Sequence, residues 1–418
     1  MTRSGIRAIV PAAAAVLIGL PAGPGPATAQ SAAVVPATHN PASPSGGRET
    51  LRLRELWRAG ADDDAVLIGT VQQALSDEQG HLYLLDRQLS QVHVFSPEGE
   101  FLRSLSREGE GPGESRQPAD LFWTADGDLG IVQGFPARVV RIDPAGQPRE
   151  SLPLGQSDPA AGGFRFAHGA LSRAGVLAFS GGEMKMAEGG VTPISFLSLC
   201  NPDGSERARL LEKTGDDIMR TRRWVEKDEY FVHGGRWTIG RDGRIYAAPE
   251  RGRYLISVFG PDGAPQATIT RDFEPRRRTA EERAAARGNV RIVANGRRVD
   301  IEEQIDDFEP CVMHLEARPD GELWVIHSRS ALDLPPGVMQ IYDAFDPAGV
   351  FVREVAVAGE GDAREDRLFL LGADRALLVN GYQGSLRISM GTGGGDEGGD
   401  ELPVGAGRPL EIICYAVE

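Results

Sequence analysis

Five polar side chains stand at the same distance before five turn glycines, and their types are capable of chemistry. Each lies seven residues before the glycine of a repeated turn. They are Gln73, Asp120, His168, Arg236 and His314, and Leu368 takes this place in a sixth, degenerate unit. A carboxylate and two imidazoles can ligate a metal, or can form a base with an orienting acid. These five residues are therefore the candidate ligand-binding set.

Three interpretations of this set are open from the sequence. The side chains form a water-filled polar funnel with a structural role, they bind a ligand, or they carry catalysis or a metal. Alternation along a strand places them on one face, and most residues two positions further on are apolar, so the set is expected at one mouth of a channel. The sequence has no G-x-S-x-G, H-E-x-x-H or Walker motif that would favour catalysis. No cofactor is expected, although a divalent metal in the channel is conceivable.

The elements that position these residues are predicted by a sixfold repeat. In each of the first five units, two apolar runs flank a turn that contains glycine, and a second turn of the form Pro-x-Gly follows. Two hairpin turns in a unit predict four strands, which in the first unit are expected at 70–76, 82–85, 92–95 and 101–105. Six such units predict an all-β fold, a six-bladed β-propeller of four-stranded blades over residues 51–418.

The sixth unit lacks a fourth strand, and the N-terminal segment is expected to supply it. Residues 51–57 alternate apolar and polar side chains, so they are predicted to pair beside residues 411–417 and close the ring. Wider spacing of the turn glycines indicates insertions at 205–233 and at about 272–307. The second insertion is predicted to hold a helix capped by Thr279 and a hairpin turn at Asn295-Gly296. Both insertions are expected over one face of the ring, where they could form a lid.

The first 29 residues have the pattern of an export signal. Two arginines precede an apolar run of 12 residues at 9–20, and Ala27-Thr28-Ala29 is a cleavage site. Residues 30–50 are rich in Ala, Pro, Ser and Gly, and they are predicted to form a disordered linker. The protein is therefore expected to be secreted or periplasmic, with no membrane span after cleavage; retention of the signal as an anchor is the alternative.

Charge and cysteine content restrict the partners. The formal charge is −15, which argues against nucleic acid and anionic membranes, because both are bound through basic surfaces. Cys200, Cys311 and Cys414 lie in or beside apolar runs of three different units and lack metal-binding spacing. They are predicted to be buried, reduced thiols, and the protein is predicted to be a monomer.

The run from Gly80 to Gly127 resembles an NHL repeat. The matching features are an apolar second strand that ends in Asp86, the Pro97-Glu98-Gly99 turn and the glycine-rich connector at 109–114. Together with the six units, they make the chain similar to the bacterial six-bladed β-propeller family, a set of exported NHL-like proteins. NHL-like propellers include calcium-dependent lactonases, amidating lyases and binding domains, so the resemblance implies a fold and does not select a reaction.

Two functions are carried forward from these observations. The first is a binding or scaffolding module for a protein, peptide or glycan at the face that bears the insertions. The alternative is a metal-dependent hydrolase or lyase, similar to the lactonases, with a site in the central channel. In the lactonases the resemblance implies a calcium held by Glu, Asn and Asp side chains, and the matched inner-strand positions of this chain do not supply that set.

Overall fold

Most of the repeats begin with a hairpin whose turn is closed by two backbone hydrogen bonds. In the first unit Asp77 N donates to His81 O (3.1 Å) and Gly80 N donates to Asp77 O (3.1 Å). The same pair of bonds closes the turn at residues 124–128 of the second unit. Gly80 has a φ of +85°, a left-handed conformation that glycine adopts without strain. The regular spacing of turn glycines in the sequence thus reflects a repeated backbone geometry.

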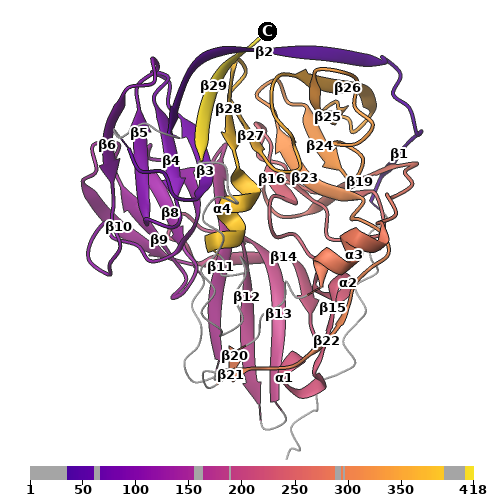
Figure 1. Ribbon diagram of the computed structural model, residues 1–418. Helices are drawn as coiled ribbons and strands as arrows, with labels where there is room; N and C mark the ends of the chain where they lie inside the picture. Colours follow the sequence, from indigo (N-terminus) through magenta and orange to yellow (C-terminus); the bar gives the residue numbers. More distant parts are fainter. Residues whose placement is uncertain are drawn as a thin grey trace, which may run out of the picture. The chain divides into compact units, whose positions relative to one another are not determined.

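Antiparallel four-stranded sheets follow one another along the chain (Figure 1). The computed structural model describes residues 35–60, 66–154, 163–187, 190–287, 293–294, 297–389 and 410–418. The first sheet contains β3 (Val71–Ser76), β4 (Leu82–Asp86), β5 (Gln91–Phe95) and β6 (Phe101–Leu105). The second contains β7 (Pro118–Trp123), β8 (Leu129–Gln133), β9 (Arg138–Ile142) and β10 (Pro148–Pro153). The four strands predicted for the first unit are confirmed.

The third sheet has the longest set of strands, and a different first turn. It contains β11 (Gly163–Arg173), β12 (Val176–Ala187), β13 (Gly190–Cys200) and β14 (Glu206–Thr214). Only Ala174 and Gly175 connect β11 to β12, and both have positive φ (+51° and +76°), as in a two-residue hairpin turn. The fourth sheet contains β16 (Trp237–Ile239), β17 (Ile245–Ala247), β18 (Leu255–Phe259) and β19 (Pro265–Arg271).

The fifth and sixth units are joined into one eight-stranded sheet by the N-terminal strand β2 (Arg48–Gly60). The fifth unit contains β23 (Val312–Ala317), β24 (Leu323–His327), β25 (Val338–Phe345) and β26 (Phe351–Ala358). The sixth contains β27 (Arg367–Leu371), β28 (Arg375–Asn380) and β29 (Glu411–Val417). The first part of β2 pairs parallel to β26, and residues 53–60 pair antiparallel to β29 (Figure 1). The predicted pairing of the N-terminal segment with residues 411–417 is confirmed.

The composition of residues 30–50 predicted a disordered linker, and the described part of that prediction is wrong. Residues 37–40 form β1 (Ala37–Asn40), which lies parallel to β19 at the edge of the fourth sheet, and β2 begins at Arg48. Asn40 is only 2% exposed. Its Nδ2 donates to Gly349 O (2.9 Å) and Thr270 O (3.0 Å), and its Oδ1 accepts from Phe351 N (2.8 Å). Edge strands offer unpaired backbone groups, so a segment without an apolar pattern can pair there.

Apolar clusters fill the interfaces between units. Six clusters occur among the described residues, and each is shared by two units. One of them contains Leu84 and Phe95 of the first unit, Val379 and Cys414 of the sixth, and Trp57 of β2. The Trp57 ring stacks on Phe95 with centroids 5.8 Å apart, and its Nε1 donates to Pro97 O (3.0 Å). The N-terminal strand is therefore packed against the first sheet as well as paired with the sixth unit.

Both predicted insertions contain short elements of their own. The first holds α1 (Ile218–Thr221), β15 (Arg223–Val225) and α2 (Glu226–Glu229), and the second holds α3 (Ala280–Ala286), β20 (Val293–Ala294), β21 (Arg297–Arg298) and β22 (Glu302–Gln304). Thr279 and Glu282 form the predicted capping box of α3. β20 and β21 pair antiparallel, while Asn295 and Gly296 between them lie outside the described residues. β15 and β22 pair parallel, so the two insertions form one structure.

The ends and the remaining helix complete the description. α4 (Tyr382–Ser389) follows β28 in the sixth unit. Residues 35–418 form one compact unit, and the predicted signal at 1–29 and its cleavage site lie outside the described residues. Among the helices of the described ranges, none is long and apolar enough to cross a membrane.

Candidate functional site

The candidate residues lie on or beside the first strand of each unit. These first strands contact one another in chain order, β3 with β7, β7 with β11, β11 with β16 and β16 with β23, and β27 contacts β3. In four of the units the first strand has a bulge that leaves one residue unpaired, and the next residue resumes the ladder. Bulges redirect side chains. The residues after the bulge are Gln73, Asp120, Gly169 and His314.

The register of the first strands differs in two units from the equivalences obtained by counting back from the turn glycines. In the third unit the equivalent of Gln73 and Asp120 is Gly169, and His168 is the bulged residue itself. Counting back from the turn glycine misplaced it by one, because the turn at residues 174–175 is shorter than the others. In the sixth unit Leu368 is part of the apolar packing between units. The neighbouring Arg367 supplies the polar group there, and its Nη1 donates to the Tyr382 hydroxyl (2.7 Å).

Gln73 and Asp120 form one part of the candidate site. Gln73 Nε2 donates to Asp120 Oδ1 (3.2 Å), and the same oxygen accepts from Leu121 N (2.9 Å). A Cβ on Gly169 would lie 2.7 Å from Asp120 Oδ2, so the missing side chain leaves room for the carboxylate. Burial raises the pKa of Asp120 to about 6, although hydrogen bonds from Leu121 N and Gln73 oppose the shift. This carboxyl group thus titrates near pH 6, above the range of an ordinary aspartate.

His168 and His233 form the second part. Their ring centroids are 4.0 Å apart with the ring planes tilted by 50°. Burial lowers the pKa of His168 to about 4. It lowers that of His233 to about 3, with further contributions from His168 and Arg236. His168 is exposed to water, but the nearby protein partly desolvates its ring. Both imidazoles are therefore neutral at neutral pH.

Arg236 holds the segment that carries His233. Its Nε donates to Phe231 O (2.6 Å), and its guanidinium lies 4.4 Å from the centroid of the Tyr230 ring. The Tyr230 hydroxyl donates to Val312 O (2.6 Å) in the fifth unit. Arg236 is thus engaged in fixing residues 230–233 to the ring of first strands.

His314 lies against the same segment from the other side. The position that a Cβ would take on Gly235 is 2.0 Å from His314 Nδ1, so only glycine fits there. Leu315 N donates to Gly235 O (2.8 Å), and His314 Nε2 is 3.4 Å from Glu316 Oε2. Among the described residues, His314 forms no hydrogen bond or ring contact with His168 or Asp120. Gln73 and Asp120 are therefore in direct contact, whereas His168, Arg236 and His314 are connected through residues 231–235.

Sequence reasoning missed His233 and Arg367. His233 is the last residue of the first insertion and lies several residues before β16, so a count along first strands could not find it. Its sequence signal is the pair Gly234-Gly235, since both glycines have positive φ (+65° and +84°) and bring the chain close to His314. Asp86, at the end of β4, accepts hydrogen bonds from Gly69 N (2.6 Å) and Thr70 N (3.2 Å) and so has a structural role.

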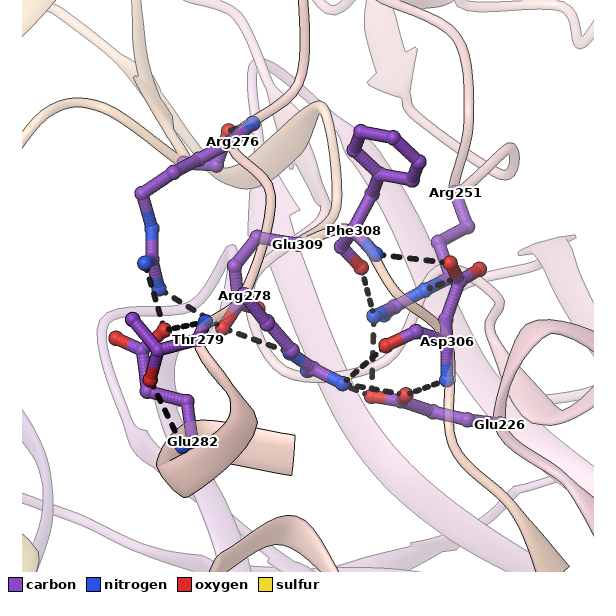
Figure 2. A network of polar contacts seen from close by, with 10 residues as sticks. Glu226, Arg251, Arg276, Arg278, Thr279, Glu282, Asp306, Phe308 and Glu309 are labelled. Carbon is purple, nitrogen blue, oxygen red and sulfur yellow. Dashed lines mark hydrogen bonds and ion pairs between the residues drawn. The ribbon is translucent and has the colours of Figure 1, made fainter. Parts of the chain in front are cut away.

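A polar network fastens the two insertions to each other and to the fourth sheet, as Figure 2 shows. Arg278 forms two bonds to Glu226 (2.6 and 2.8 Å) and bonds to Glu309 at 2.9 and 3.0 Å. Arg251, 6% exposed, is 3.1 Å from Glu226 and 3.3 Å from Asp306. Burial opposes ionisation of Glu226, but the hydrogen bond from Arg278 and the other cations lower its pKa overall. The network holds α2 and therefore the start of residues 230–233.

The described residues contain three free thiols and no cluster of potential metal ligands. The part of the chain that the structure describes contains no group of three or more His, Cys, Asp or Glu side chains arranged to hold a metal ion. Cys200, Cys311 and Cys414 are free and buried, as predicted. Burial raises the pKa of the Cys200 thiol to about 12 and those of the other two to about 11.

The chain has an all-β, propeller-like fold of four-stranded sheets. Residues 62–144 match the model of a family described as a 6-bladed beta-propeller, and this confirms the predicted resemblance. No curated protein matches the sequence.

Several solved structures are similar over most of their length. A protein of Bacteroides fragilis, described as exported, is 12% identical, with a TM-score of 0.47 over 91% of this chain and 99% of that chain. Virginiamycin B lyase from Staphylococcus aureus is 10% identical, with a TM-score of 0.40 over 87% and 99%. Regucalcin from Agrobacterium tumefaciens, described as a calcium-binding protein, is 11% identical, with a TM-score of 0.43 over 88% and 96%.

Proposed function

We propose that the protein is an exported, six-bladed β-propeller that binds a protein, peptide or glycan partner at the face bearing the two insertions. The observation that carries this proposal is the network around Arg278. In this network the half-buried carboxylate of Glu226 is paired with Arg251 and Arg278, which come from different segments. A loop that served only as a solvated connection would not require such pairing. Ordering these segments costs conformational entropy, and a rigid, fastened cover is a usual way to hold a binding surface.

Closure of the ring by β2 is the architectural part of the proposal. It is supported by the apolar cluster that the first and sixth units share, and by the position of Trp57 within it. It is also supported by the backbone bonds between Arg52 and Glu418, which are 2.9 Å in both directions. A closed ring leaves no unit with an unprotected apolar face.

The insertions connect directly to the candidate residues. Residues 230–233 run from the end of α2, which the network holds, to the imidazole pair, and Lys213 Nζ donates to Tyr230 O (3.0 Å) along the way. A partner seated on the insertions would therefore be next to His168 and His233. This geometry favours one continuous surface over two independent sites.

Site-specific photo-cross-linking tests the proposal. A photoreactive residue replaces Met219 in the first insertion or Phe308 in the second, both of which are 40% exposed. Leu102, also 40% exposed but in the first sheet, is the matched control. The proposal expects the same adduct from the first two positions and none from Leu102. Equal labelling at all three positions, or no adduct from either insertion, would contradict it.

The alternative is a metal-dependent hydrolase or lyase. The observation in its favour is the ionisation of Asp120 near pH 6 beside an arginine, which suits a general base. Elemental analysis of the purified protein tests it. A stoichiometric divalent ion that Asp120→Asn removes would favour the enzyme, whereas its absence from protein isolated without chelators would favour the binding module.

A further inference from the structure

Five rings follow one another from the second sheet to the imidazole pair, and we call them the ring ladder. They are Phe135, Phe164, Phe166, His168 and His233. Ring centroids are 5.5 Å apart for Phe135 and Phe164, 5.0 Å for Phe166 and His168, and 4.0 Å for the two histidines. Phe164 and Phe166 are two residues apart in the regular part of β11, so they share one face of the third sheet. The ladder thus consists of one phenylalanine pair and one row of three rings, which the spacing of Phe164 and Phe166 places on the same strand face.

The outer half of the ladder is exposed. Phe135 is 62% exposed and Phe164 is 44% exposed, and His168 is also exposed. A phenylalanine pair packed edge to face and left open to water is unusual on a soluble protein, where large apolar side chains gather mainly at binding sites. Phe166 lies across the strand partner Gly182, where a Cβ would be 2.2 Å from the ring. That glycine lets the Phe166 ring lie over the backbone of β12.

The sheet face that carries the ladder has no charged side chain at the positions of β12 that pair with Phe164 and Phe166, or at the positions of β13 next to them. The residues paired with Phe164 and Phe166 are Met184 and Gly182, and these pair in turn with Pro193 and Ser195. The charged groups of the same strands lie on the opposite face. There Arg165 is paired with Glu183 (3.4 Å) and Glu206 (3.2 Å). The cation of this row is Lys213 of β14, which pairs with Ser195, and its Nζ is bonded to Tyr230 O (3.0 Å).

The histidine end supplies hydrogen bonds without charge. A neutral imidazole offers one donor and one acceptor, and desolvation by the nearby protein lowers the pKa of both rings, which are therefore neutral at neutral pH. His168 makes ring contacts but no hydrogen bond to the described residues. His233 Nε2 is 3.4 Å from the half-buried Ser195 hydroxyl. The ladder thus joins apolar ring faces to groups that both donate and accept.

We propose that the ring ladder binds a neutral oligosaccharide, an inference that rests on the proposed binding function and names its ligand class. A pyranose ring has an apolar C–H face that packs on an aromatic ring, and a rim of hydroxyl groups that donate and accept hydrogen bonds. Successive sugars repeat this pattern along a chain, as the ladder repeats its rings. Sites of this kind combine aromatic surfaces with few, well-placed polar groups.

Binding to defined oligosaccharides tests the inference on the full-length protein. The probes are immobilised neutral hexasaccharides (of glucose, mannose and xylose), acidic oligogalacturonates, and an array of apolar and proline-rich peptides. The expected result is binding to at least one neutral hexasaccharide and weaker binding to the acidic series. In proton NMR, the same sugar should shift the imidazole C2–H resonance of His168.

Matched variants locate the binding. Phe135→Ala with Phe164→Ala should weaken the Kd for the bound hexasaccharide at least tenfold, because both sugar-stacking surfaces are lost. Exposed side chains of this kind change stability little, and circular dichroism checks that the fold is intact. Leu102→Ala, at 40% exposure in the first sheet, should leave the Kd within twofold of the unmodified protein.

The outcomes separate this inference from the proposed function. Absence of binding to every neutral sugar, or binding that survives the double phenylalanine change, would overturn the oligosaccharide assignment. Binding to the peptide array alone, lost in the double variant, would also overturn it, in favour of an apolar peptide. If the cross-links from Met219 and Phe308 still form in these cases, the binding module stands and only its ligand class falls.

Discussion

Within residues 37–47, Asn40 is expected to contribute more to the free energy of unfolding than any other residue. The amino-acid composition of this segment is typical of a linker. Its side chain makes three hydrogen bonds, all to backbone groups of the fourth and fifth units. In Asn40→Ala the Phe351 N–H loses its partner, and Phe351 is 1% exposed. An unpaired buried donor costs about 1–3 kcal/mol. The two carbonyls add less, because each has a second lone pair, so the total is expected to be about 3 kcal/mol.

Urea unfolding measures this loss. The midpoint should fall with an unchanged m-value, since the area exposed on unfolding is the same. His39→Ala is the control, because His39 lies beside Asn40 and its imidazole is 66% exposed next to Asp272. An exposed ion pair of this kind contributes about 0–1 kcal/mol. If Asn40→Ala and His39→Ala unfold at the same urea concentration, the bonds of Asn40 do not hold β1, and the reasoning fails.

Three further predictions concern closure, pH and the insertion network. Trp57→Ala should cost about 3–5 kcal/mol of unfolding free energy, and Trp57→Phe should restore part of it in the same urea assay. Because the folded state keeps His168 and His233 neutral, the unfolded chain binds protons that the folded chain does not as pH falls below about 6.5. Stability should therefore decrease from about pH 6.5 towards pH 4, and His233→Gln should flatten this slope; an equal slope in both proteins would refute the assignment. Arg278→Ala should cost about 1–3 kcal/mol, because Glu226 and Glu309 each keep only one arginine partner, and adding Glu226→Gln should recover part of that loss in a double-mutant cycle.

The repeat made the strands predictable, because turns such as that at Gly80 demand a residue that tolerates positive φ. The pairing of residues 51–57 was also predictable, since their alternation matches a half-buried strand. β1 was not, because its pairing depends on backbone groups and on one asparagine. The amino-acid composition of a segment indicates neither which backbone groups will pair nor which asparagine will be buried.

The candidate site was predictable in part. Gln73 and Asp120 do meet across two units, as a common register requires. The count along the chain made His168 the equivalent of Gln73 and Asp120, but the shorter turn of its unit makes Gly169 the equivalent residue. His233 could not be found from periodicity, because it is placed by the network that holds α2 and by the close approach of Gly235 to His314. Contacts between insertions are set by tertiary packing, which a repeat does not encode.

The position of β2 has a consequence for biosynthesis. It is among the first strands to leave the ribosome, but its partners β26 and β29 come at residues 351–358 and 411–417. Until β26 and β29 are made, the backbone edges of β2 have no strand partners in their own chain, and such long-range pairing forms slowly. Two molecules that refold side by side at high concentration can therefore exchange this strand. The product would be a swapped dimer with the same contacts as the monomer, and dilution before refolding would suppress it.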